Sequence, residues 1–258
     1  MPRPAGQDVE ERPQPQEEPV PNPESSTIPL QETELSDIPL PPQGVPHVEE
    51  EEPEFQIPLG MHILYVLLSP LMVPTIVSLF IFLLSILAIV IPDAVVPYTL
   101  TVFGATCVVP LVGLFLLQKV GIVKTFRMYS RKERVFPYVI EFLALGAMAL
   151  FFALRGANAW IWTIYCGGAA IALVNFLINF KLRISSHCSA MAALLASLIV
   201  INKYGFPQAS LFWWVVGTVF FAGLIGTLAM LEGRHTFREV LAGYATGFLG
   251  IILFSLIH

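Results

Sequence analysis

Charged residues are scarce in this sequence: they occupy 13% of the 258 positions, while 55% of the residues are hydrophobic. A typical soluble domain has about 25% charged residues. The scarcity therefore excludes soluble domains as the main part of the chain and indicates that most of it lies in lipid. Cysteine is also rare, and Cys107, Cys166 and Cys188 lack metal-binding spacing. We interpret them as small core residues.

The first 58 residues have few basic and aromatic side chains but are rich in acid and proline. They hold fourteen of the nineteen Asp and Glu residues, fourteen of the twenty-one prolines and two bases, Arg3 and Arg12. Such a composition cannot bury enough apolar surface to offset chain entropy, so we predict a disordered acidic tail over 1–58. No positively charged start precedes an apolar run there. We therefore expect no secretory signal peptide, and the first membrane helix serves as the insertion signal.

Residues 59–258 contain repeated apolar stretches long enough to cross about 30 Å of hydrocarbon, which takes about 20 residues of helix. They predict an all-α, polytopic membrane helix bundle of about six to seven transmembrane helices. Ser69-Pro70 and Val73-Pro74 predict a kink or a re-entrant piece in the first. The expected helices are at about 62–91, 95–118, 137–154, 158–180, 188–202, 209–230 and 240–257.

Ten of the twelve Lys and Arg residues of this part lie in three breaks between helices, at 119–136, 181–187 and 231–239. Two helices separate each of these breaks from the next, so parity places all three on one membrane face. The positive-inside rule alone would read them as cytoplasmic loops. However, His187 and His235 also fall in these breaks, each just before an expected helix. This coincidence favours a shared, positively charged site.

The same three breaks contain spaced polar motifs. Arg131 lies seven residues after Lys124, Ser185 and Ser186 directly precede His187, and Glu239 lies four residues after His235. In order and helix spacing, over about residues 61–257, these motifs resemble the signatures of the type 2 phosphatidic acid phosphatase superfamily. The similarity is greatest to a bacterial branch common in Bacteroidetes.

The resemblance implies an integral-membrane phosphatase-like protein of the bacterial inner membrane. Its substrate would be a lipid phosphate: phosphatidate, phosphatidylglycerophosphate, an isoprenyl diphosphate or a lipid A phosphate. His235 would be the nucleophile that forms a phosphohistidine, His187 the general acid, and Glu239 the carboxylate that orients His235. Because a phosphoryl group needs several converging donors, the expected phosphate-binding residues are Lys124, Arg131, Ser185, Ser186 and Arg234.

The sequence contains no nucleotide-binding loop, paired metal carboxylates or zinc spacing, so we expect a site without metal or cofactor, and no nucleic-acid partner. One departure from the superfamily matters. Ala229 occupies the position of its phosphate-binding arginine. A catalytically impaired relative that binds anionic lipid or a partner therefore remains an alternative. A small transporter is another, although Glu141 alone supplies no path for a solute.

Overall fold

The structure, a computed structural model, describes residues 59–121 and 135–257, and these residues are helical with no strand. The predicted tail at 1–58 and the predicted phosphate ligands Lys124 and Arg131 lie outside the described residues. The α-helices are α1 (Leu59–Leu67), α2 (Val73–Leu84), α3 (Leu87–Val90), α4 (Val95–Phe103), α5 (Val109–Lys119), α6 (Val135–Leu154), α7 (Ala159–Asn179), α8 (Ser186–Tyr204), α9 (Phe212–Leu231) and α10 (Phe237–Ser255).

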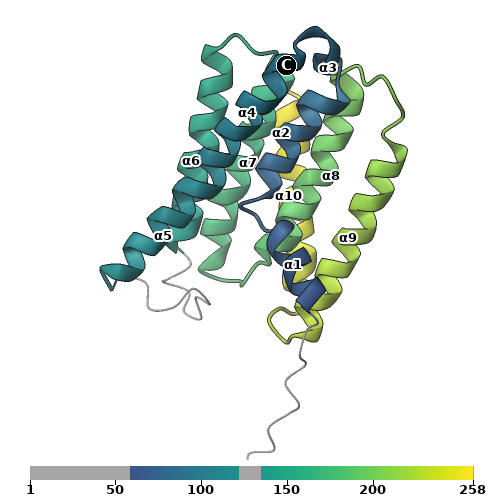
Figure 1. Cartoon of the computed structure of the whole chain (residues 1–258). Coiled ribbons are helices and arrows are strands. Elements are labelled where there is room, and N and C mark those ends of the chain that lie inside the picture. Colours follow the sequence, from purple (N-terminus) through teal and green to yellow (C-terminus); the bar gives the residue numbers. More distant parts are fainter. Residues whose placement is uncertain (1–58, 122–134, 258) are drawn as a thin grey trace, which may run out of the picture. The chain divides into compact units, whose positions relative to one another are not determined.

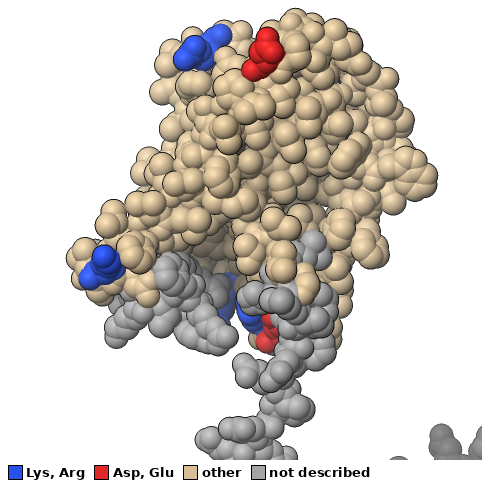
Figure 2. All heavy atoms as spheres, viewed as in Figure 1, with Lys and Arg blue, Asp and Glu red and all other residues tan. Residues whose placement is uncertain are grey.

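Six stretches of the described residues are long and apolar enough to cross a membrane. They are Pro92–Lys119 and the five helices from α6 to α10. The predicted all-α fold of six to seven membrane helices is confirmed, and the chain is a multi-pass integral membrane protein. In Figure 2, acidic and basic side chains appear only toward the two ends of the visible face, as expected for a surface whose middle contacts lipid.

The expected single helix at 62–91 is instead broken into α1, α2 and α3. Pro70 has no N–H to donate, and the chain leaves the helical path between Leu68 and Met72 before Pro74 starts α2 at one of its first positions. A second break follows at Ser85, whose hydroxyl accepts from the backbone N–H of Leu87 at 3.2 Å. Breaks at membrane depth are tolerated where protein covers the backbone, and Ser85 is fully buried.

The second membrane segment, taking Pro92–Lys119 as the second, contains a π-helical turn over Gly104–Val108 that ends two residues before Pro110. Proline cannot donate the usual bond to the carbonyl four residues earlier, here that of Thr106. The backbone N–H of Val109 bonds to the carbonyl of Gly104, five residues back, so the turn widens ahead of the proline. The span continues through this defect as α5.

The helix ends gather at two ends of the bundle (Figure 1). The end of α5, the start of α6, the α7–α8 turn and the α9–α10 turn lie at one end, while α3 and the C-terminus lie at the other. Thus the described parts of the three basic breaks share one end. At the opposite end, Arg155 follows the last residue of α6 and Lys203 lies in the last turn of α8.

Small residues allow α8 and α10 to pack closely together. Among the described helices, this pair has the most extensive contact. A Cβ on Gly247 would lie 2.0 Å from the carbonyl oxygen of Ser189, and one on Gly243 would lie 2.6 Å from that of Ser185. Glycines four residues apart on one helix face are a common device for close packing in lipid. Here they hold the start of α10 against the start of α8, which is where two of the predicted site motifs lie.

Candidate functional site

The start of α10 fixes the position of Glu239. Thr236 is the N-cap residue and forms a capping box with Glu239, whose Oε2 accepts from the Thr236 backbone N–H at 3.0 Å. The same Oε2 lies 3.4 Å from Nδ1 of His235. One carboxylate oxygen therefore both caps the helix and faces the imidazole.

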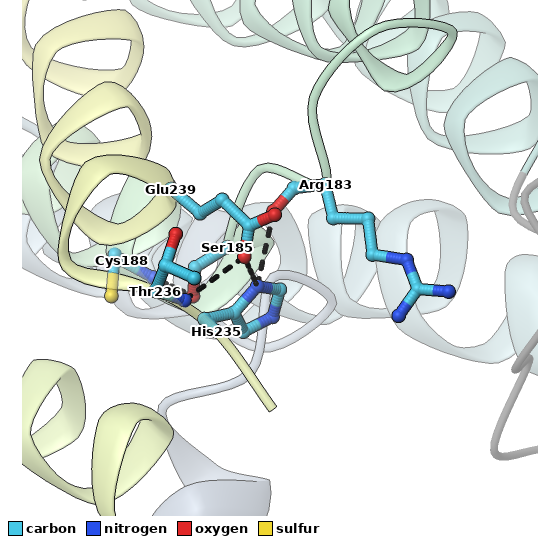
Figure 3. A network of polar contacts seen from close by, with 6 residues as sticks. All are labelled: Arg183, Ser185, Cys188, His235, Thr236 and Glu239. Carbon is cyan, nitrogen blue, oxygen red and sulfur yellow. Dashed lines mark hydrogen bonds and ion pairs between the residues drawn. The ribbon is translucent and has the colours of Figure 1, made fainter. Parts of the chain in front are cut away.

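Contacts to Nδ1 orient the His235 ring. Its Nδ1 lies 3.0 Å from the backbone carbonyl oxygen of Arg183, on the turn before α8 (Figure 3). A carbonyl oxygen can only accept, so Nδ1 carries the hydrogen, and in the neutral ring the lone pair belongs to Nε2. The His235 backbone N–H donates to the carbonyl of Ala229 at 3.1 Å, which ties the loop back to α9.

The start of α8 is coupled to the start of α10. Ser185 caps α8 by accepting from the Cys188 backbone N–H at 3.5 Å, and its own N–H bonds to the carbonyl of Glu239 at 3.4 Å. Ser185 is fully buried, so the structure gives it a capping role, and its predicted contact with phosphate remains a prediction. Ser186, the first residue of α8, is partly exposed and lines a cavity inside the bundle.

His187 lies in the first turn of α8, not ahead of the helix as we expected. Its ring stacks on Tyr65 of α1, with ring centroids 3.9 Å apart and an interplanar angle of 24°. The Arg234 guanidinium also faces the Tyr65 ring, so Tyr65 is a shared neighbour of His187 and Arg234. The structure thus brings His187, His235, Glu239 and Arg234 to the same end of the bundle.

Arg234 takes part in two contacts. Its Nε lies 2.6 Å from Oε2 of Glu232, and its guanidinium lies 5.6 Å from the centre of the Tyr65 ring. The side chain remains about half exposed. It can therefore still reach an anion at this end of the bundle, although Glu232 already neutralises part of its charge.

Tyr65 and Arg183 belong to this region but were not predicted from the sequence as site residues. Tyr65 lies in an apolar helix far from the other motifs, where an aromatic residue gives no signal. Arg183 belongs to a basic break but matched no motif. Its carbonyl holds His235, and its side chain extends away from Thr236 and Glu239 (Figure 3).

Asn175 belongs to a hydrogen-bonded group that supports the site from within the bundle. Its Nδ2 donates to Ser189 at 3.1 Å, and its Oδ1 accepts from the Thr246 hydroxyl at 3.1 Å. These bonds join α7, α8 and α10, and Asn175 is buried. Asn175 is therefore an interhelical hydrogen-bonding residue.

Ala229 is fully buried in the hydrophobic core, on α9. An arginine at this position would have to place its guanidinium among apolar side chains. Replacement by Arg is therefore expected to destabilise the bundle.

Among residues 59–121 and 135–257, no three His, Cys, Asp or Glu side chains are grouped as a metal site would require. Comparison of the chain with protein families, curated proteins and solved structures gives no match. What the site can do must therefore be argued from its residues.

The stack between Tyr65 and His187 predicts a positioning role for Tyr65. Tyr65→Phe keeps the stacked ring and should leave the function of His187 almost unchanged. Tyr65→Ala removes the ring, leaves His187 free to rotate, and should reduce about tenfold the rate of any reaction that depends on His187, since stacked pairs contribute about 0.5–1.5 kcal/mol. Steady-state rates of the two variants check this, and equal rates would contradict it.

Proposed function

We propose that this chain is an integral-membrane phosphatase of lipid phosphates that acts through a phosphohistidine at His235. One observation carries the proposal. Arg183 and Glu239 both face Nδ1 of His235, at 3.0 Å and 3.4 Å, which assigns the hydrogen to Nδ1 and the nucleophilic lone pair to Nε2. The resemblance of the motifs to the type 2 phosphatidic acid phosphatases supports the same assignment.

In the first step, Nε2 of His235 attacks phosphorus and the bond from phosphorus to the lipid oxygen breaks. His187, which must carry a proton for this step, gives it to that leaving oxygen. The phosphorylated ring carries a positive charge, which the Glu239 carboxylate beside Nδ1 stabilises. In the second step, neutral His187 takes a proton from water, the resulting hydroxide attacks phosphorus, and inorganic phosphate leaves His235.

The phosphoryl oxygens need several donors. Among the described residues, the exposed Arg183 and the half-exposed Arg234 are cations near His235 and His187, and the start of α8 offers backbone N–H groups with a favourable helix dipole. By resemblance to the type 2 phosphatidic acid phosphatases, Lys124 and Arg131 supply the remaining donors.

The location of the site at one end of the membrane helices, where a lipid head group would lie, supports this substrate class. Phosphatidate, phosphatidylglycerophosphate, an isoprenyl diphosphate and a lipid A phosphate all present a phosphate at that level. We propose that the membrane is the bacterial inner membrane, by resemblance. Release of inorganic phosphate from a panel of these lipids by the purified protein tests the proposal, and no release from any of them would refute it.

A second candidate function is binding of an anionic lipid head group without hydrolysis. The observation that favours it is the buried Ala229 at the position of the superfamily's phosphate-binding arginine. Retained binding of lipid phosphates by a protein that releases no phosphate would support this alternative.

The carboxylate of Glu239 is expected to matter for catalysis more than for folding. Glu239→Gln keeps an oxygen that can cap Thr236 but loses the charge that stabilises the phosphorylated ring. We expect turnover to fall about tenfold to a hundredfold, as for loss of a charged hydrogen-bond partner worth about 1.5–3 kcal/mol, with little change in thermal stability.

Glu232→Gln is the matched control for Glu239→Gln. It removes a neighbouring carboxylate that pairs with Arg234 and not with His235. Its turnover should stay within a few-fold of wild type. If both variants lose activity equally, the local negative charge matters and the specific contact with His235 does not.

A further inference from the structure

A small cavity of about 50 Å³ lies inside the bundle, lined mainly by α2, α6, α7 and α8. On α8 its lining extends from Ser186 to Ser197, eleven residues apart, which is about 16 Å at 1.5 Å per residue. The first residue of α8 lies at the site end of the bundle. Because the hydrocarbon layer is about 30 Å thick, the cavity extends from that end to about the middle of the membrane.

Four polar residues line the part of the cavity near the site end. Asn175 of α7 donates to Ser189 of α8 at 3.1 Å, and Ser186 lies three residues before Ser189. Glu141 lies six residues after the first residue of α6, and α6 also begins at this end. The Asn175 amide has a second N–H, and the hydroxyls and the carboxyl can bind further partners. This part of the wall can therefore hydrogen-bond a small polar molecule.

Tyr165 and Ser197 bring polar groups to the deeper part of the cavity. Counted from the contact between Asn175 and Ser189, Tyr165 lies ten residues along α7 and Ser197 eight residues along α8, or about 15 Å and 12 Å. The two helices run in opposite directions, so both residues lie at nearly the same depth. Each is only 1% exposed.

The Tyr165 hydroxyl has no hydrogen-bond partner among residues 59–121 and 135–257. A buried hydroxyl without a partner is costly, and such a group in a folded protein calls for an explanation. Ser197 donates its hydrogen to the carbonyl oxygen of Ala193 at 2.8 Å, so its own oxygen can still accept. A water molecule that accepts from Tyr165 and donates to Ser197 would satisfy the tyrosine.

The size and chemistry of the cavity agree with water as its occupant. A water molecule needs about 10–15 Å³ of such volume and two to four polar partners, so about 50 Å³ holds roughly three or four molecules. A Ca²⁺ or Mg²⁺ ion needs six or more oxygen ligands at one point. The polar groups of this wall are divided between two levels about 12–15 Å apart, which suits separate waters and not one ion.

We propose that this cavity binds water, and that one water molecule joins Tyr165 of α7 to Ser197 of α8 near the middle of the membrane. The other water molecules bind the four polar residues near the site end. This hydration site takes no part in the chemistry at His235 and does not rest on the proposed function. It supplies inside the membrane the hydrogen bond that Tyr165 obtains from no described residue.

The first test detects the water directly by solid-state NMR. The full-length protein, labelled with ¹³C in the isoleucine δ1 methyl groups, is reconstituted in lipid with deuterated chains, and magnetisation is transferred from water protons to the methyl groups. Ile164 and Ile171 line the cavity, whereas Ile81 and Ile225 are fully buried outside its wall. The first pair should gain signal from water clearly earlier than the second. Equally late signals for both pairs would overturn the proposal.

Tyr165→Phe keeps the ring and removes the hydroxyl, so the sign of its effect distinguishes a hydrated cavity from a dry one. With water bound, the hydroxyl has a partner, and its loss should lower the midpoint of thermal unfolding by about 2–4 °C. In a dry cavity the hydroxyl has no partner, and its removal should raise the midpoint. A raised or unchanged midpoint would contradict the bridging water.

Three further variants locate the water. Ser197→Ala removes the other end of the bridge, and the double variant with Tyr165→Phe should lose less stability than the sum of the two single losses, because the hydroxyls share one water. Additive losses would overturn the bridge. Ala193→Leu fills the cavity and should abolish the early NMR signal of Ile164, while Ala147→Leu, on the exposed face of α6, is the matched control and should retain it. An early signal that survives Ala193→Leu would contradict water in this cavity.

Discussion

His235→Ala is expected to abolish turnover of lipid phosphates and any acid-labile phospho-enzyme. In the proposed mechanism the side chain supplies the attacking Nε2, and its removal also ends the contact between Nδ1 and the Arg183 carbonyl. Loss of a catalytic nucleophile typically lowers turnover by about 10⁴-fold or more. Phosphate release and the phospho-enzyme are measured together on the same preparation.

The control for this variant is His235→Asn. An asparagine amide can donate to the Arg183 carbonyl as Nδ1 does, so the loop should keep its conformation while the nucleophile is absent. Both variants should unfold near the temperature of wild type. Rapid hydrolysis by either one would show that the nucleophile has been assigned to the wrong residue.

Gly247→Ala is expected to have the largest effect on folding. The new Cβ would lie 2.0 Å from the carbonyl oxygen of Ser189, and this oxygen belongs to the backbone of α8, which cannot turn away. The two helices must separate, which we expect to cost about 2–3 kcal/mol or more, as for severe overpacking. Thermal unfolding in detergent should show a clearly lower midpoint.

Gly217→Ala is the matched control for Gly247→Ala. Gly217 lies in α9 with no atom within 4 Å of the position of a Cβ, so an alanine there should be neutral or stabilise the helix by up to about 1 kcal/mol. Equal midpoints for the two variants would contradict the close approach of α8 and α10. Because that approach also holds Ser185 against Glu239, Gly247→Ala should reduce turnover as well.

The membrane helices could be predicted from sequence because the solvent imposes one requirement, a long apolar helix, on each of them. Five of the seven expected helices agree with α6–α10 within a few residues, and the expected helix at 95–118 agrees with α4 and α5. Ser69-Pro70 and Val73-Pro74 predicted a kink or a re-entrant piece in the first helix. Its division into three pieces depends on contacts such as that of Ile86 with the carbonyl of Gly205, which no local pattern encodes.

In the candidate site, too, local contacts could be predicted from sequence and contacts between distant residues could not. The capping box of Thr236 and Glu239 is local, and the spacing of Glu239 from His235 predicted that they share a helix start. The contact between His235 and the Arg183 carbonyl joins positions 52 residues apart and became visible only with the fold. The stack of Tyr65 on His187 and the burial of Ala229 likewise depend on which helices are neighbours.

The most direct test of the proposed chemistry is to identify the phosphorylated residue itself. The full-length protein is mixed with a lipid phosphate that it hydrolyses, quenched within one turnover under alkaline conditions that preserve phosphohistidine, and digested for mass spectrometry. We predict phosphate on His235, removed by acid and absent in His235→Asn. Rapid hydrolysis with phosphate on another residue, or with no phosphorylated residue at any quench time, would contradict a phosphohistidine mechanism at this site.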